Sequence, residues 1–313
     1  MTVIWILLAL LLLALCACTV CFLMVFYSAP RKESDEITIP FGEIYEEYRE
    51  VMVDWVKKAR AMPHRDVIVT SFDGLTLRGK FYEYAKGAPI EILFHGYRGN
   101  AERDLSGGVV RCALLGHSAL IVDHRASGKS DGRVITFGVR ESQDCDTWVS
   151  FVLREIDPCA KIILTGISMG AATVLIASQK EYPKNVVGVL ADCGYTSAKE
   201  IIRKVIADLH LPPALLYPFV RLSARLFGGF DPESLSPIEA MKHCRLPVLF
   251  YHGDTDAFVP CEMSEKNYNA CVSPKKELII IPGAGHGLCF PKDRERYLLA
   301  ARAFFDPLTS PDK

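Results

Sequence analysis

The chain of 313 residues is long enough for one large domain or two small ones, and its 50% hydrophobic content excludes a disordered protein. Its 36 basic and 37 acidic residues give a net charge of -1, so nucleic acid is not an expected partner. The mean hydropathy of +0.17 is high for a water-soluble enzyme, and the sequence shows that the apolar surplus is concentrated in one segment.

That apolar segment is the N-terminus. Residues 2–27 carry no charge and outnumber the roughly 20 helical residues that cross a bilayer core, so they predict a single transmembrane helix. Trp5 and Tyr27 suit interface anchors. A cleaved signal peptide is the alternative, but no basic residue precedes the run and its apolar core is too long. Because Arg31 and Lys32 follow the run, the positive-inside rule predicts a cytoplasmic domain after it.

The cysteines agree with that location. Cys16, Cys18 and Cys21 lie in the apolar segment and are candidates for acylation, although ordinary apolar helix positions explain them better. The other eight are scattered without CxxC pairs or metal-ligand spacing, which is typical of a reducing compartment. The sequence also contains no N-x-[ST] sequon.

The next segment, residues 28–62, is a juxtamembrane linker with an amphipathic helix. Between residues 41 and 59, apolar side chains recur with the period of one helix face. A domain over residues 63–313 follows. It opens with two strand-like runs, 66–71 and 75–84, that meet at Asp73-Gly74 and predict an antiparallel hairpin.

The rest of the domain alternates short apolar runs with segments of helical composition. The runs are 90–94, 119–122, 161–167, 186–191, 247–251 and 277–281. They predict an α/β fold whose mostly parallel sheet is covered by helices on both faces. Residues 194–245 exceed a single crossover helix and contain two helical patterns, so we expect a cap over the carboxyl ends of the strands.

The candidate nucleophile is Ser168. It lies in the pentapeptide Gly-Ile-Ser-Met-Gly, residues 166–170, which follows one of the strand-like runs and precedes a helix-like run. That context predicts a nucleophile elbow, in which flanking glycines permit a strained turn that presents the hydroxyl. An ordinary strand-to-helix turn with a capping serine is the alternative.

A serine nucleophile needs a base and an acid, which follow it in the order Ser, Asp or Glu, His. His286 lies between glycines after the last strand and is the candidate base. Two aspartates, Asp254 and Asp256, follow the preceding strand. Both loops leave the carboxyl ends of strands, so the three groups are expected to meet.

From about residue 66 to the C-terminus, these motifs resemble the α/β-hydrolase superfamily, in its aminopeptidase-like and acylglycerol-lipase-like branches. The HGxxDxxVP loop of such hydrolases implies Asp256 as the acid, and Asp254 is then expected to bond backbone amides within its own loop. His252 and His95, which precede glycines at strand ends, are expected to pack and to make loop hydrogen bonds.

The resemblance also implies the oxyanion hole. Residues 95–100, His-Gly-Tyr-Arg-Gly-Asn, look like the family's oxyanion loop, so the backbone amides of Tyr97 and Met169 are the implied donors. Residues 123–130 resemble the family's D-x-R-G-x-G-x-S loop, with Ala126 where glycine is usual. A phosphate-binding loop would need a glycine at Asp123, so Arg125 and Ser130 are expected to brace loops instead.

The expected function is cleavage of carboxylic esters, including lipid or acyl esters, through Ser168, His286 and Asp256 and an acyl-enzyme. This chemistry requires no metal or organic cofactor. A serine peptidase of aminopeptidase type is the alternative within enzymes, and a catalytically silent, membrane-tethered binding protein is the alternative outside them. The small-molecule substrate itself depends on how the cap packs.

Overall fold

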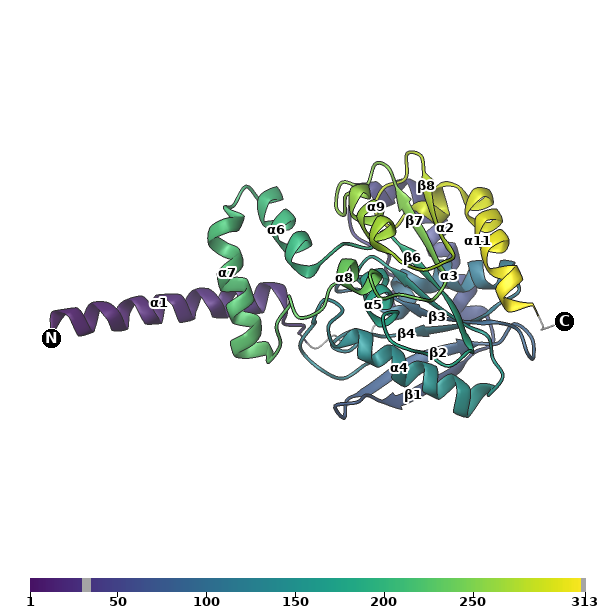
Figure 1. The fold of residues 1–313 in the computed structure, drawn as a ribbon, viewed down its shortest axis with the longest axis horizontal. Coiled ribbons are helices and arrows are strands. Elements are labelled where there is room, and N and C mark those ends of the chain that lie inside the picture. Colours follow the sequence, from purple (N-terminus) through teal and green to yellow (C-terminus); the bar gives the residue numbers. More distant parts are fainter. Residues whose placement is uncertain (30–34, 311–313) are drawn as a thin grey trace.

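The computed structural model describes residues 1–29 and 35–310, which form one mixed sheet between two layers of helix (Figure 1). The eight strands lie in the order β1-β2-β4-β3-β5-β6-β7-β8. β1 and β2 are antiparallel, β2 is antiparallel to β4, and all later neighbours are parallel. The strands are β1 (Arg65–Thr70), β2 (Thr76–Tyr82), β3 (Ile90–Phe94), β4 (Ser118–Val122), β5 (Ile162–Ile167), β6 (Val186–Asp192), β7 (Val248–Gly253) and β8 (Lys276–Ile281). The predicted fold class is confirmed.

Helices cover both faces of the sheet because the central strands are buried along their whole length. One layer contains α2 (Arg49–Ala61), α3 (Ala101–Leu115) and α11 (Arg294–Thr309), and the other contains α4 (Glu141–Phe151), α5 (Met169–Ala177), α8 (Pro237–Met241) and α9 (Cys261–Ala270). The short helix α10 (Cys289–Lys292) precedes α11, and π-helical turn η2 (Val152–Ile156) extends α4. Each layer packs on its own apolar cluster, one around Trp148 and Phe250 and the other around Trp55 and Phe304.

The segment predicted as one helix over residues 41–59 is divided in two. A 3₁₀ helix, η1 (Glu43–Tyr48), precedes α2. Gly42 has φ 132°, a left-handed conformation that stops the helix from extending back to Phe41, which is fully exposed. The buried side chains, Met52, Trp55, Val56 and Ala59, belong to α2, whereas Tyr45 and Tyr48 of η1 pack on the domain while only partly buried.

The N-terminal helix α1 (Thr2–Val25) projects from the domain as a single rod (Figure 1). Judged by length and composition alone, α1 is long enough and apolar enough to cross a membrane. Its last turns are built into the domain, because Cys18 and Phe26 are fully buried. The chain continues into an isolated antiparallel bridge between Tyr27 and Val134. Arg31 and Lys32, on which the prediction of membrane side depends, lie outside the described residues.

The insertion over residues 194–245 holds α6 (Ala198–Asp208), α7 (Pro213–Ser223), π-helical turn η3 (Ala224–Gly228) and α8. Figure 1 shows α7 beside α1, with α6 packed against α7. Phe22 of α1 lies 5.6 Å from Phe227, and Phe26 lies 5.3 Å edge-on from Phe230, as measured between ring centroids. Helix α1 and the insertion therefore share one apolar cluster.

Candidate active site

Ser168 occupies the sharp turn between β5 and α5. Its φ is 56°, a left-handed conformation that side chains rarely adopt. The turn needs the glycines on either side of it. A Cβ on Gly166 would lie 2.1 Å from the carbonyl oxygen of Gly170, and a Cβ on Gly170 would lie 2.0 Å from that of Phe94. The sequence thus forms a strained strand-to-helix turn that presents the Ser168 hydroxyl at the carboxyl end of the sheet.

The structure brings Ser168, His286 and Asp256 together. The His286 Nε2 atom lies 2.9 Å from Ser168 Oγ, and Nδ1 lies 2.7 Å from Asp256 Oδ2. Because a carboxylate only accepts, Nδ1 carries the imidazole proton and donates to Asp256. Nε2 then has a free lone pair for the Ser168 hydroxyl, which is the arrangement that deprotonates a serine during attack.

Asp256 is held in its charged form by its neighbours. Burial by itself would raise the pKa of this carboxyl, but hydrogen bonds from His252 and His286 lower it well below its usual range. The amides of Phe258 and Val259 donate to Oδ1 at 2.9 and 2.8 Å. The carboxylate is therefore fixed in position and oriented toward His286.

Asp254 has a different partner from the one we expected. Its Oδ1 accepts a 2.6 Å hydrogen bond from the amide of Gly283, in the loop after β8, rather than from amides of its own loop. Strands β7 and β8 pair in parallel register, so the loops that follow them lie side by side. The expectation was wrong because this places the Gly283 amide within reach of Asp254. Asp254 joins the two loops, and Asp256 contacts the imidazole.

His95 and His252 make the expected loop hydrogen bonds. His95 Nδ1 bonds the carbonyl of Gly96 at 2.7 Å, and His252 Nε2 bonds that of Val259 at 2.8 Å. His252 has one further contact that the sequence did not indicate, because its Nε2 also lies 3.3 Å from Asp256 Oδ2. Its Nδ1 lies 2.6 Å from Ser264 Oγ.

The loop after β3 lies against the nucleophile. A Cβ on Gly96 would lie 3.5 Å from the Cβ of Ser168, so this backbone passes directly beside the serine. Met169 is the first residue of α5, where helix amides have no intrahelical acceptor. The implied oxyanion donors, the amides of Tyr97 and Met169, thus belong to two segments that both adjoin Ser168.

This loop is also tied to the N-terminal helix, which no sequence motif indicated. The Tyr97 hydroxyl donates to the carbonyl of Val25 at 2.6 Å. Arg98, with φ 54°, donates from Nη2 to the carbonyls of Met24 at 2.9 Å and Tyr27 at 3.1 Å. Met24 and Val25 are among the last carbonyls of α1, which have no partner within the helix, and Tyr27 lies two residues beyond its end.

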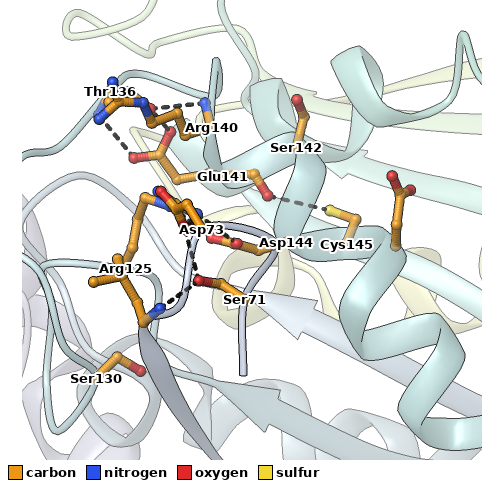
Figure 2. A network of polar contacts seen from close by, with 12 residues as sticks. Ser71, Asp73, Arg125, Ser130, Thr136, Arg140, Glu141, Ser142, Asp144 and Cys145 are labelled. Atoms are coloured by element: carbon orange, nitrogen blue, oxygen red, sulfur yellow. Dashed lines mark hydrogen bonds and ion pairs between the residues drawn. The ribbon is translucent and has the colours of Figure 1, made fainter. Parts of the chain in front are cut away.

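The loop over residues 123–141 is braced as expected (Figure 2). Arg125 donates two hydrogen bonds of 2.7 and 2.8 Å to Asp144 and two of 2.8 and 3.1 Å to Asp73. Ser130 Oγ donates to the carbonyl of Asp123 at 2.8 Å. Ala126 has φ 60°, the conformation for which glycine is the usual residue.

A cavity of about 510 Å³ opens beside Ser168 and His286, a size typical of small-molecule sites. Its wall includes apolar side chains of α2, α3 and α10, such as Trp55, Leu105 and Phe290, together with the charged Arg103 and Asp104 of α3. The segment over residues 40–45 also borders it, through Phe41 and Ile44 among others. Among the described residues that line the cavity, none belongs to 194–245. Of the two segments, residues 28–62 contribute to the wall and residues 194–245 do not.

Three possible metal ligands also meet at this site. Cys193, Asp256 and His286 offer atoms within 4.8 Å of one another. Burial raises the pKa of the Cys193 thiol well above its usual value, so the thiolate that binds metals is disfavoured. The other two groups already bond each other. The donor set therefore suits a Ser-His-Asp site better than a metal centre.

Comparisons with known proteins agree with this architecture. No protein-family model matches the chain. The uncharacterized protein YqkD of Bacillus subtilis is 29% identical over 193 residues, which are 61% of this chain and 63% of that protein. The chain thus spans a little less than two thirds of that relative.

Solved structures show the same fold. A Pyrococcus furiosus esterase has a TM-score of 0.70 at 21% identity over 91% of this chain and 99% of its own. The mouse α/β hydrolase domain-containing protein 10 has a TM-score of 0.56 at 22% identity, covering 78% and 99%. A Pyrococcus horikoshii acylaminoacyl peptidase has a TM-score of 0.60 at 18% identity, covering 82% of this chain and 43% of its own. The chain has the α/β-hydrolase fold.

Proposed function

We propose that the protein is a serine hydrolase that cleaves carboxylic esters through an acyl-enzyme on Ser168. The observation that carries this proposal is the hydrogen-bonded series from Asp256 through His286 to Ser168 Oγ, with distances of 2.7 and 2.9 Å. A hydroxyl, an imidazole and a buried carboxylate in that order supply a nucleophile, a base and a group that orients the base.

In the first half of the reaction, Ser168 Oγ attacks the ester carbonyl and its proton passes to His286 Nε2. The resulting imidazolium is stabilised by Asp256, which stays ionised. The amides of Tyr97 and Met169 are the donors to the oxyanion, and removing one such donor typically costs on the order of a hundredfold in rate. His286 then protonates the leaving alcohol. In the second half, water gives its proton to His286 and cleaves the acyl-enzyme, which regenerates Ser168.

The cavity favours an ester with an apolar acyl part. It begins at Ser168 and His286, and its wall includes Trp55, Leu105 and Phe290. Apolar walls bind hydrocarbon by excluding water, at about 0.8 kcal/mol for each buried methylene. The proposed substrate class is therefore a medium or long acyl ester, including esters of lipids.

A peptidase of aminopeptidase type is the second candidate, because one of the structures with this fold is an acylaminoacyl peptidase. The same serine chemistry cleaves amides when the site protonates the leaving amine. Hydrolysis rates for matched esters and amides of one acyl group distinguish the two candidates.

We further propose that α1 is retained and anchors the protein in a membrane, with the domain in the cytoplasm. Support for retention comes from the last turns of α1, because Phe26 is fully buried and Val25 accepts a hydrogen bond from Tyr97. A signal peptide that is removed has no reason to be packed into the mature domain.

The test is labelling and turnover of the full-length protein in detergent. We expect a fluorophosphonate probe to label the wild type but not Ser168→Ala, and this variant to lose p-nitrophenyl ester turnover by several orders of magnitude. A wild type that resists the probe and turns over no ester would instead support a silent binding protein. An unchanged Ser168→Ala variant would show that another residue is the nucleophile.

A further inference from the structure

Helix α7 is apolar on both of its faces. One face is buried in the cluster shared with α1, through Tyr217 and Val220, and continues onto Ala224 of η3. The opposite face carries Leu215 and Leu222, which continue onto Leu226 of η3 at helical spacing, and these side chains are 62%, 44% and 57% exposed. A helix that is apolar all round is normally covered on every side.

The apolar surface extends beyond this stripe. Leu209 and Leu211, in the connection between α6 and α7, are also exposed, as is Phe227. Between residues 209 and 220 the sequence contains no Asp, Glu, Lys or Arg. Water-soluble proteins rarely expose a continuous apolar patch of this kind unless it binds a partner or a membrane.

The geometry of α1 identifies what covers this surface. The whole helix has 24 residues, or about 36 Å, which exceeds the roughly 30 Å hydrocarbon core of a bilayer. The part before Ala14, where partly buried positions begin, is only about 18 Å long. If α1 crosses the core, several of the turns that pack on α7 must lie within the near leaflet, and α7 must lie there with them.

We propose that the insertion is a second membrane contact, in which residues 209–227 lie in the near leaflet of a phospholipid bilayer beside α1. The hairpin of α6 and α7 would immerse its exposed leucines among the acyl chains, as amphipathic helices do when they lie in a membrane interface. Helices α1 and α7 pack against each other (Figure 1), so a membrane that receives α1 also reaches α7.

The charged side chains near this surface are compatible with a segment that lies at the membrane interface. Arg221 and Arg225 both bind Asp231, with Arg221 Nε at 3.0 Å and Nη2 at 2.9 Å. Arg221 also pairs with Glu233 at 3.1 Å, so two carboxylates balance the two guanidinium groups, and the part of the segment before Arg221 carries no Asp, Glu, Lys or Arg. Thr19 in α1 donates its hydroxyl to the carbonyl of Leu15 at 2.9 Å, which satisfies its hydrogen bond inside the helix.

The inference rests on the proposed anchoring by α1, and one experiment tests the two separately. The full chain is reconstituted in phosphatidylcholine vesicles whose acyl chains are brominated, because bromine quenches tryptophan fluorescence on contact. Quenching of native Trp5, measured as the difference between the wild type and Trp5→Phe, reports α1. Trp55 and Trp148 are buried in the domain and give a constant background.

The insertion is probed in the Trp5→Phe background. Leu222→Trp adds one reporter on the exposed stripe. Leu299→Trp adds a control reporter on α11, far from α1, where Leu299 is 61% exposed, more than Leu222 at 44%. We expect brominated lipid to lower the added emission of Leu222→Trp about twofold or more, and to leave that of Leu299→Trp unchanged. Leu215→Trp replaces Leu222→Trp if circular dichroism shows misfolding.

The outcomes separate the explanations. Quenching of Trp5 without quenching of Leu222→Trp and Leu215→Trp overturns this inference and leaves the anchor intact. Absence of quenching at Trp5 overturns the anchor and the inference together. A reporter at 222 that is shielded from aqueous acrylamide, yet insensitive to brominated lipid, would show that a second copy of the chain covers the face, and would also overturn the inference.

Discussion

The hydroxyl of Tyr97 donates a 2.6 Å hydrogen bond to the backbone carbonyl of Val25, which joins the loop beside the nucleophile to the end of the N-terminal helix. Arg98 binds one further carbonyl of the same helix end, that of Met24, and the carbonyl of Tyr27 just beyond it. The position of the loop that would supply an oxyanion amide therefore depends on a helix located more than seventy residues earlier in the chain.

The first prediction concerns this link. Tyr97→Phe removes one hydrogen bond and should lower kcat for p-nitrophenyl esters several-fold, because the amide of Tyr97 is then less firmly placed. Tyr195→Phe is the matched control, since its hydroxyl donates to the carbonyl of Phe137 at 3.0 Å rather than to α1. Both variants should lose about 1–3 kcal/mol of unfolding free energy, but only Tyr97→Phe should lose kcat. Equal kcat values in the two variants would contradict the link.

The second prediction separates the two aspartates after β7. Asp256→Asn should reduce kcat by about 10³–10⁴-fold, because an amide cannot hold His286 in the required tautomer or stabilise its cation. Asp254→Asn keeps an oxygen for the Gly283 amide and should change kcat only slightly. Steady-state kinetics with one ester measures both. A loss with Asp254→Asn as large as that with Asp256→Asn would refute the assignment.

The third prediction concerns substrate preference. Ile44 borders the cavity, whereas Leu215 on α7 does not. We expect Ile44→Ala to lower kcat/KM several-fold for a long-chain p-nitrophenyl ester relative to the acetate, because part of an apolar wall is removed. Leu215→Ala should leave that ratio unchanged in detergent. The reverse pattern would indicate that the insertion sets chain-length preference.

The fourth prediction uses the buried ion pair of Glu91 and Arg111. Burial alone would raise the pKa of Glu91, but Arg111 and His117 lower it to about 2. Since the unfolded value is about 4.3, this carboxylate stabilises the fold above pH 4.3, and the contribution disappears as the pH falls toward 2. Glu91→Gln should therefore cost about 3–5 kcal/mol at pH 7, because Arg111 is left buried without its counter-charge.

Urea unfolding at pH 7 and pH 3 measures this effect, and the difference between wild type and Glu91→Gln should be smaller at pH 3. Glu102→Gln is the control, because the ion pair of Glu102 with Arg60 is about one third exposed and should be worth about 1 kcal/mol or less. A pH-independent difference for Glu91→Gln would show that its charge does not account for the stability.

Much of the fold and the positions of Ser168 and His286 could be predicted from the sequence. Apolar runs of four to seven residues marked the strands within one or two residues, because a buried parallel strand must be apolar on both faces. The glycines around Ser168 indicated the strained turn, because no other residue fits where backbones approach so closely. These features are local, because they depend on steric contacts between residues that are close together in the sequence.

Only the tertiary structure decided the contacts between distant segments. It paired Asp254 with Gly283, placed residues 40–45 rather than the insertion along the cavity, and packed the insertion against α1. The apolar period that predicted one helix over 41–59 could not distinguish side chains that enter the core from those that border a cavity. The hydrogen bond between Tyr97 and Val25 could not be predicted from the residue types of either segment, because a backbone carbonyl accepts a hydrogen bond whatever its side chain. Such contacts depend on how the whole chain packs, and that packing is a property of three-dimensional proximity rather than of spacing along the sequence.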